Sequence, residues 1–382
     1  MIRRVVVSNF RSLGEGIVFR PGRLTALVGP NESGKGNLAD VFPFVADALR
    51  AGLDEAIADR KGIQAVRRWG AGRVLDVGIH LDVEDQRVTG SYEFVIGSRG
   101  SEGYWVKHEA ARVTAAGAEV SYLVADGAWR EGPPGLLPKV DRERLALPVV
   151  AADERFGPLE AALRSMVVYA IFPDTLREPQ EPNPRRPLDE HGANWASVLR
   201  GLVGTPSASE FKAALGRLAG DIADVRVQEV GGYLVAEFLH VRGQGRPERQ
   251  GVWFPAVQES DGTLRVAGIL TALLQEPSLA LVGVEEPELT VYPHAIPMLF
   301  DYLREASYRS QVLVTTHSPE LLALLDPDDV WVVERREGVT SVGPVETSQR
   351  EAVRRGVVSL EDVLRMEGLR QEGAEPESTP RW

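Results

Sequence analysis

GPNESGKGN, residues 29–37, is the stretch that decides the fold of this 382-residue chain. An apolar run at 24–28 precedes it and a second apolar segment at 38–42 follows, which predicts a buried strand, a glycine-rich loop and a helix start. Backbone N–H groups of such a loop cradle phosphate oxygens, while the lysine, here Lys35, reaches the terminal phosphates of a nucleotide. The next position usually carries a hydroxyl that holds Mg²⁺, but here it is Gly36. The stretch therefore predicts a P-loop that lacks one metal ligand; the alternative is a turn that binds nothing.

The composition indicates a globular protein. At 43% hydrophobic residues the chain can build more than one core, either in two domains or in one large domain with a subdomain. The net charge of −12 argues against a surface coated for nonspecific nucleic-acid binding, although a local basic patch stays open. Cysteine is absent, which excludes disulfides and thiolate chemistry. No apolar run approaches the roughly 20 residues of a membrane span, and no signal region follows Met1, so we expect a soluble, cytoplasmic protein without membrane contact.

The first half of the chain predicts short strands around the P-loop and then a β-rich region. Strands are predicted at 3–7 and 16–19, and a helix is predicted over 37–50 with a kink at Pro43. Beyond residue 52, runs of alternating apolar and polar residues predict an antiparallel sheet. These runs lie at 74–83, 91–96 and 119–124.

The middle of the chain predicts a helical lobe. A helix at 157–166 and a buried strand at 167–172 are followed by a proline-rich segment, 173–190, which we interpret as a long loop and a candidate lid. Two helices follow, the second with Ser209 as its predicted N-cap. The helices lie at 194–202 and 209–218, and the strands after them at 225–230, 233–241 and 251–254.

The last third alternates between helices and strands. Helices are predicted at 263–274, 292–306 and 319–325, and strands at 279–284, 311–315 and 330–333. This alternation predicts a parallel sheet with helices on both faces. The fold class is therefore α/β, a P-loop NTPase with a mostly parallel central sheet, an antiparallel β subdomain and a helical lobe.

Consecutive carboxylates follow the strand at 279–284. Glu285 and Glu286 stand where that strand ends, and Glu288 follows after one proline. A P-loop ATPase needs such acids opposite the phosphates, one for Mg²⁺ and the next to polarise the attacking water. The alternative is an ordinary solvated turn.

Two further elements stand at helix starts. His317 follows the strand at 311–315, on the same edge of the sheet, where it could reach a γ-phosphate or the attacking water. It could also be a helix-start residue, because Ser318 is a good N-cap ahead of Pro319. The motif ESDGTLR at 259–265 precedes another helix, and its serine and glycine predict either an anion site or a simple cap.

Taken in order, these motifs resemble the ABC-type ATPase heads of the RecF, structural-maintenance-of-chromosomes (SMC) and OLD group, within the AAA family ATPases. The resemblance covers nearly all of residues 1–345. The motifs that carry it are NFRSL at 9–13, GPNESGKGN at 29–37, ESDGTLR at 259–265, LALVGVEEPE at 279–288 and VLVTTHSPE at 312–320.

The resemblance implies a role for each matching residue. Glu285 would act at Mg²⁺, Glu286 would be the catalytic base, and His317 would be the switch histidine. The candidates for binding the ATP phosphates and the rest of the nucleotide are Arg11, Asn31, Glu32, Ser33, Gly34, Lys35, Gly36 and Asn37. The signature, which would close over the nucleotide of the opposite subunit in a head-to-tail dimer, is Ser260, Asp261 and Gly262. The glutamine that completes Mg²⁺ coordination stays open among Gln64, Gln86 and Gln180.

The resemblance also indicates which members of this ATPase group the chain is most similar to. Coiled-coil arms and room for a Toprim nuclease are missing from the sequence, which predicts a stand-alone head that works with a separately encoded effector. Such heads resemble the ATPase halves of bacterial DNA repair or anti-phage defence systems. The predicted divisions are an N-terminal ATPase part at 1–51, the β subdomain at 52–150, a helical or lid lobe at 151–222, a C-terminal ATPase part at 223–366 and a disordered tail at 367–382.

Three functions follow from the sequence. The leading hypothesis is an ATP-hydrolysing dimeric switch with ATP and Mg²⁺ as cofactors. Because of Gly36, the second is an ATP-sensing regulatory subunit with little turnover. The third is a protein that binds DNA ends or DNA structures through basic spots, which could equally form solvated faces. Those spots are Arg60 with Lys61, Arg67 with Arg68, Arg185 with Arg186, and Arg242, Arg246 and Arg249.

Overall fold

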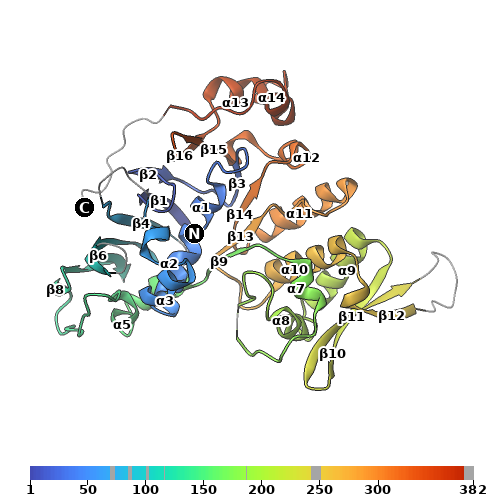
Figure 1. The fold of residues 1–382 in the computed structure, drawn as a ribbon, viewed down its shortest axis with the longest axis horizontal. Coiled ribbons are helices and arrows are strands. Elements are labelled where there is room, and N and C mark those ends of the chain that lie inside the picture. Colours follow the sequence, from blue (N-terminus) through green and yellow to red (C-terminus); the bar gives the residue numbers. More distant parts are fainter. Residues whose placement is uncertain are drawn as a thin grey trace. The chain divides into compact units, whose positions relative to one another are not determined.

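The computed structural model describes residues 1–68, 74–84, 88–99, 103–115, 117–185, 187–241 and 251–373. The chain forms two compact units, one from Met1–Val167 together with Leu325–Trp382 and one from Val168–Leu324 (Figure 1). No helix within the described ranges is long and apolar enough to cross a membrane.

An antiparallel sheet dominates the first unit. Its strands follow the order β2-β1-β4-β5-β6-β7-β8, with every neighbouring pair antiparallel. The predicted antiparallel sheet is confirmed, and it also takes in both strands at the N-terminus. The bounds are β1 (Ile2–Ser8), β2 (Ile17–Phe19), β4 (Val77–Glu84), β5 (Thr89–Arg99), β6 (Gly103–Ala115), β7 (Ala118–Ala125) and β8 (Ala128–Glu131).

Strand β6 was not predicted, and a buried carboxylate explains why. Glu109 points into the core, where it is fully buried, at a position where an apolar residue would mark a strand. Its oxygens accept hydrogen bonds from the hydroxyls of Tyr92 (3.0 Å) and Tyr122 (2.8 Å). The backbone N–H groups of Ala146 (2.5 Å) and Leu147 (2.8 Å) also donate to it. Four donors replace the lost water, so a charged residue type occupies a core position.

The P-loop belongs to a second set of strands in the same unit. Strand β3 (Leu24–Val28) pairs in parallel with β15 (Val330–Arg336), which pairs antiparallel with β16 (Val339–Pro344). All of β3 is buried. The parallel pairing places the end of β3, and hence the start of the loop, beside the middle of β15.

The helix predicted over 37–50 is two helices, α1 (Lys35–Ala39) and α2 (Val41–Arg50), which meet at Asp40. The predicted kink at Pro43 is therefore wrong. Pro43 stands in the first turn of α2, where its missing N–H leaves no helical bond unmade. Phe44 of α2 packs against Phe10 (5.1 Å between ring centroids) and Phe94 (6.4 Å) and thereby joins the helix to the antiparallel sheet.

Further helices complete the first unit, and of these only α6 was predicted, at 157–166. Residues 367–373, part of the predicted tail, lie against β16 and α13: Gln371 Nε2 donates to Ser341 Oγ (2.6 Å), and Gln349 Nε2 donates to the carbonyl of Gly368 (3.0 Å). Residues 374–382 of that tail lie outside the described residues. The bounds are α3 (Leu53–Asp59), α4 (Ile63–Val66), α5 (Leu147–Val150), α6 (Gly157–Arg164), α13 (Thr347–Arg354) and α14 (Leu360–Met366).

The second unit is built around one buried helix and a parallel strand pair. Helix α10 (Asp261–Leu274) is buried from Leu264 onward and packs against α7, α8, α9 and α11 (Figure 1). Strands β13 (Leu281–Glu285) and β14 (Gln311–Thr316) are parallel, as predicted. The remaining bounds are β9 (Met166–Tyr169), whose first two residues belong to the first unit, α7 (Pro173–Arg177), α8 (Trp195–Leu202), α9 (Ala208–Ala219), β10 (Ile222–Val230), β11 (Tyr233–Val241), β12 (Gly251–Pro255), α11 (Ile296–Ala306) and α12 (Pro319–Leu322).

The proline-rich segment is not simply a long loop. It begins as α7, and Gln180 then ties it to the rest of the unit by donating to the carbonyl of Gly192 (2.8 Å) and accepting from the N–H of Ala196 (2.8 Å). The predicted N-cap Ser209 is wrong as well, because α9 begins at Ala208 and Ser209 stands inside its first turn.

A charged cluster on the antiparallel sheet makes stability depend on pH. The ring of His80 lies between Asp82 (Nε2 to Oδ1, 2.9 Å) and Glu93 (Nδ1 to Oε2, 2.8 Å). Burial alone would lower the pKa of His80, but its hydrogen bonds to the two carboxylates outweigh burial and raise that pKa from 6.5 to about 9.

We therefore expect His80 to stabilise the first unit below pH 6.5 and to lose this contribution as the pH rises from 6.5 through 9, because the folded protein binds the proton more tightly. The melting temperature should fall more steeply over this range in wild type than in His80→Gln. Exposed Arg112→Gln on the same sheet is the control and should follow wild type. Parallel curves for wild type and His80→Gln would contradict the assignment.

Candidate functional site

The glycine-rich loop adopts a conformation that few residue types allow. Glu32 has φ +63° and Gly34 has φ +102°. A Cβ on Gly29 would lie 2.2 Å from the carbonyl oxygen of Val333, and one on Gly34 would lie 2.3 Å from Thr340 Oγ1. Both positions must therefore be glycine for the loop to close against β15 and β16. The predicted order of strand, loop and helix is confirmed.

Lys35 begins α1 and folds back over the loop. Its Nζ donates to the carbonyl oxygens of Gly29 (2.7 Å) and Pro30 (3.0 Å). Gly36 is exposed and brings no side chain to the site. Among the described residues, the backbone N–H groups of Gly36 and Asn37 find no acceptor, as expected for the first turn of a helix. A lysine cation and free N–H donors at one loop fit the phosphates of a nucleotide.

A chain of hydrogen bonds joins the loop and the start of α1 to Ser12 and to Thr340 of β16. Asn37 Nδ2 donates to Ser12 Oγ (2.6 Å), and Ser12 Oγ lies 2.7 Å from Thr340 Oγ1. Thr340 Oγ1 in turn donates to the carbonyl oxygen of Ser33 (2.9 Å), and Thr340 is fully buried. We call Asn37, Ser12, Thr340 and Ser33 the P-loop relay. Thr340 was missed by sequence reasoning because it lies in no motif.

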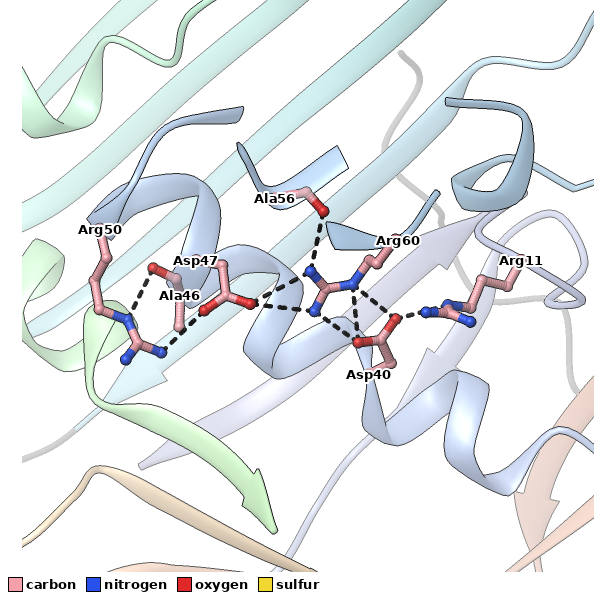
Figure 2. Close-up of polar contacts among 7 residues, drawn as sticks. All are labelled: Arg11, Asp40, Ala46, Asp47, Arg50, Ala56 and Arg60. Carbon is pink, nitrogen blue, oxygen red and sulfur yellow. Dashed lines mark hydrogen bonds and ion pairs between the residues drawn. The ribbon is translucent and has the colours of Figure 1, made fainter. Parts of the chain in front are cut away.

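Arg11, predicted to contact nucleotide, is fixed by an ion-pair network. Its Nε lies 2.6 Å from Asp40 Oδ2, and Arg60 Nη2 lies 2.7 Å from Asp40 Oδ1 (Figure 2). Arg60 also contacts Asp47 (3.3 Å). Because only 7% of the Arg60 side chain is exposed, the prediction that Arg60 contributes to a basic surface spot is wrong.

The second unit brings together the predicted acids and the histidine. Glu285 ends β13 opposite Thr315 of β14, so both strands deliver their following residues to one edge. Glu286 has φ +42°, and its Oε1 lies 3.1 Å from Nδ1 of His317, whose ring is partly exposed. A carboxylate in contact with an imidazole at a strand edge can hold and move a proton.

Glu288 and Ser318 support this edge. Glu288 is buried and accepts from Thr316 Oγ1 (2.5 Å), and burial raises the pKa of its carboxyl group. Ser318 Oγ accepts from the N–H of Leu321 (3.2 Å), which confirms it as the N-cap of α12.

Arg265 of α10 holds the backbone of the acids. Its Nη2 donates to the carbonyl oxygens of Glu285 (2.9 Å) and Glu286 (3.0 Å), and its Nη1 donates to that of Ile171 (2.7 Å). The side chain is buried, and burial lowers the pKa of the guanidinium group. The sequence shows Arg265 only as the last residue of ESDGTLR, with no signal for this role.

The signature residues begin α10. Ser260 is the N-cap of the helix, since its Oγ accepts from the N–H of Thr263 (3.1 Å), and Asp261 forms an ion pair with Arg177. A Cβ on Gly262 would lie 2.6 Å from the carbonyl oxygen of Thr290. Only glycine therefore leaves room for the loop at Thr290 to lie against the start of α10. Ser260 thus caps its helix, and Ser260 and Gly262 also line a cavity of about 280 Å³ together with Thr290, Tyr292 and His294.

The candidate glutamines differ in their surroundings. Gln180 is engaged within the second unit, as described above, and Gln86 lies outside the described residues. Gln64 is exposed in the first unit and lines a cavity with Arg11 and Asn37. In the described part of the chain, no three carboxylate or imidazole side chains are arranged to hold a metal ion.

Solved structures with a similar fold include SMC heads. The Smc head bound to the C-winged helix domain of ScpA has a TM-score of 0.54 at 15% identity, covering 92% of this chain and 99% of that chain. The Smc head domain with an extended coiled coil, bound to the C-terminal domain of ScpA and derived from Pyrococcus furiosus, has a TM-score of 0.53 at 13% identity, covering 93% and 99%. No curated protein matches the chain. The fold is that of an ABC-type ATPase head.

The family assignment agrees with this fold. The family described as "AAA domain, putative AbiEii toxin, Type IV TA system" matches residues 24–323, and the chain belongs to this family. The chain therefore carries an AAA domain whose fold is similar to that of SMC heads.

We expect Thr340→Val to weaken ATP binding about fivefold, because it removes the hydroxyl that joins Ser12 to the Ser33 carbonyl and one such bond contributes about 1 kcal/mol. Thr340→Ser keeps the hydroxyl and should bind as wild type does. The measurement is titration of a fluorescent ATP analogue, with melting curves to confirm folding. Equal affinities for wild type and Thr340→Val would show that the relay does not support the loop.

We expect Arg265→Met to slow ATP hydrolysis on the order of 100-fold while changing ATP affinity little, because it releases the backbone of Glu285 and Glu286 and small displacements of catalytic groups carry penalties of that size. Arg265→Lys should recover part of the rate. Arg304→Met, at an exposed ion pair of the same unit, is the control. If affinity and rate fall together, or if neither changes in folded protein, Arg265 does not position the acids.

Proposed function

We propose that this chain is an ATP-hydrolysing dimeric switch that uses Mg²⁺. The observation that carries the proposal is the contact between Glu286 and His317 at the carboxyl edge of two parallel strands. In an AAA-type ATPase that also has a glycine-rich loop with Lys35, this pair supports roles as catalytic base and switch residue.

The P-loop is suited to ATP, and Glu285 would supply one oxygen ligand for the metal. Lys35 and the unpaired N–H groups of Gly36 and Asn37 would bind the phosphates. Mg²⁺ keeps several waters and takes ligands from one or two carboxylates and the phosphates of its substrate, which agrees with the lack of an all-protein metal cluster in the described residues. At Gly36 a water would replace the missing hydroxyl. Bound Mg²⁺ would neutralise charge on the phosphates.

Within the second unit, Glu286 would accept the proton of the attacking water. His317 keeps the carboxylate oriented through its 3.1 Å contact, and Arg265 fixes the backbone of Glu286 from behind. These contacts restrain both the side chain and the backbone of the proposed base.

We further propose a head-to-tail dimer in which Ser260, Asp261 and Gly262 close over the partner's nucleotide. Tyr292, 70% exposed, and Leu289, 41% exposed, flank this cavity region and would be covered on association. Binding of ATP more tightly by the closed dimer would drive closure. A separately encoded effector in DNA repair or anti-phage defence is the proposed output. The toxin system in the family description and the ScpA domain named with the Smc heads support a partner protein.

A second candidate is an ATP sensor with little turnover, and Gly36 favours it. Without the hydroxyl, the metal site loses one protein ligand, which weakens Mg²⁺ binding more than phosphate binding. The two candidates share ATP binding and dimerisation and differ only in hydrolysis.

We expect wild type to dimerise with ATP and Mg²⁺, Lys35→Ala to stay monomeric, and Glu286→Gln to form a longer-lived dimer without turnover. Light scattering after size exclusion and phosphate release measure the two properties. If Gly36→Ser raises the rate more than tenfold from a near-zero wild-type value, the sensor reading holds. Absence of ATP binding by wild type at millimolar Mg²⁺ would reject both.

A further inference from the structure

An imidazole ring lies between two carboxylates beside the signature residues of the second unit. Nε2 of His240 lies 2.7 Å from Oε1 of Glu259, and its Nδ1 lies 3.0 Å from Oδ1 of Asp221. We call these three residues the histidine bridge. Burial alone would lower the pKa of His240, but its hydrogen bonds to the two carboxylates outweigh burial and raise that pKa. A ring that meets a carboxylate at each nitrogen is best satisfied as a cation, which donates a hydrogen bond on both sides.

The histidine bridge joins three segments that are far apart in the sequence. Asp221 lies between α9 and β10, His240 belongs to β11, and Glu259 lies between β12 and α10 (Figure 1). The N–H of Val241 also donates to the carbonyl oxygen of Asp221 (3.0 Å), so backbone and side-chain contacts both fix Asp221 to β11. Residues 242–250, between β11 and β12, lie outside the described residues, and so do the predicted basic residues Arg186, Arg242, Arg246 and Arg249.

Glu259 depends on His240 for its burial. Only 4% of its side chain is exposed, and burial raises the pKa of its carboxyl group, while the hydrogen bond and the charge of His240 work against that rise. Among the described residues, no other side chain donates to the Glu259 carboxylate. Removing one partner of a buried ion pair leaves an uncompensated charge, which is strongly destabilising. The position of Glu259 is therefore set by β11, through the ring of His240.

The histidine bridge ends where the signature begins. Glu259 directly precedes Ser260, and both residues have extended backbone ahead of the first turn of α10. The cavity of about 280 Å³ that Ser260 lines is also lined by Gly220, which directly precedes Asp221. The two outer members of the bridge therefore adjoin two walls of one cavity, and His240 holds these walls at a fixed separation.

We propose that His240 is a positioning residue for the signature. By holding Glu259 against Asp221 it fixes Ser260 at the start of α10, and the cavity wall that would face the partner's nucleotide keeps its shape before the dimer forms. A surface that is already ordered loses less conformational entropy on association than one that must first be ordered. The effect on closure rests on the proposed dimer, whereas the effect on Ser260 does not.

Two substitutions separate the two ends of the bridge. His240→Gln brings an amide donor near the position of Nε2 and keeps the contact with Glu259, whereas His240→Asn brings one near Nδ1 and keeps only the contact with Asp221. Glu259→Ala removes the first contact from the other side and serves where His240→Asn does not fold. The control is Arg226→Gln, which breaks an ion pair with Glu237 on the same sheet but outside the bridge.

We expect His240→Gln to behave as wild type, and His240→Asn and Glu259→Ala to weaken the ATP-dependent dimer about tenfold, the size of one lost charge-assisted hydrogen bond. The dimer dissociation constant is measured by analytical ultracentrifugation with Glu286→Gln added to each protein, so that turnover does not consume the ATP. The affinity of the monomer for a fluorescent ATP analogue should stay unchanged, because the P-loop belongs to the first unit. An equal fall in both affinities would contradict a role confined to the signature.

Hydrogen exchange without nucleotide tests the position of Ser260 directly. The N–H groups of Thr263 and Leu264, which donate to Ser260, should exchange about tenfold faster in His240→Asn than in wild type, and at the wild-type rate in His240→Gln and Arg226→Gln. Equal exchange in His240→Asn and His240→Gln would overturn the proposal, as would equal dimer affinities of His240→Asn and wild type. If wild type forms no dimer with ATP, the proposed function fails, and the exchange rates alone decide whether His240 positions Ser260.

Discussion

The hydroxyl of Thr340 is the contact on which the shape of the P-loop depends. Leaving the Ser33 carbonyl without a partner inside the protein would cost about 1–3 kcal/mol, whereas the Ser12 hydroxyl would keep its hydrogen bond from Asn37. The left-handed conformation of Glu32 costs about 1 kcal/mol or more. The free energy that this hydrogen bond contributes is therefore large enough to offset the cost of the Glu32 conformation. Gly34 is needed because any Cβ there would occupy the place of the Thr340 hydroxyl.

Asp40 links the P-loop helix to the arginines around it. It ends α1 and precedes α2, and its two carboxylate oxygens divide between Arg11 and Arg60 (Figure 2). A buried guanidinium without a carboxylate would be strongly destabilising, so Arg60 requires Asp40 and Asp47. Because α1 ends and α2 begins at Asp40, the carboxylate of this residue can form ion pairs with both the buried Arg60 and the partly exposed Arg11.

Local signals in the sequence predict the P-loop, the parallel strands and the acids with the histidine, because each is encoded within about ten residues. Contacts between distant segments could not be predicted. Thr340 meets Ser33, and Arg265 meets Glu285, only after the chain has folded. Strand β6 was not predicted, because Glu109 is a charged residue type at a core position. The four donors that make its burial tolerable come from three other segments. The error at Pro43 has a different origin, since a proline in a first turn and a proline in a helix interior look alike without the helix boundary.

The conformation of Glu286, in the second unit, bears on the choice between the hydrolysing function and the sensor that Gly36 favours. Glu286 adopts φ +42°, a strained conformation that persists only where neighbours enforce it. Its N–H donates to the carbonyl of Thr315 (2.9 Å), and Arg265 donates to its carbonyl, so both sides of the residue are held. A nucleotide sensor needs phosphate binding and a dimer surface but gains nothing from a strained, doubly anchored carboxylate against a histidine. The strain at Glu286 is therefore better explained by the proposed hydrolysing function than by the sensor.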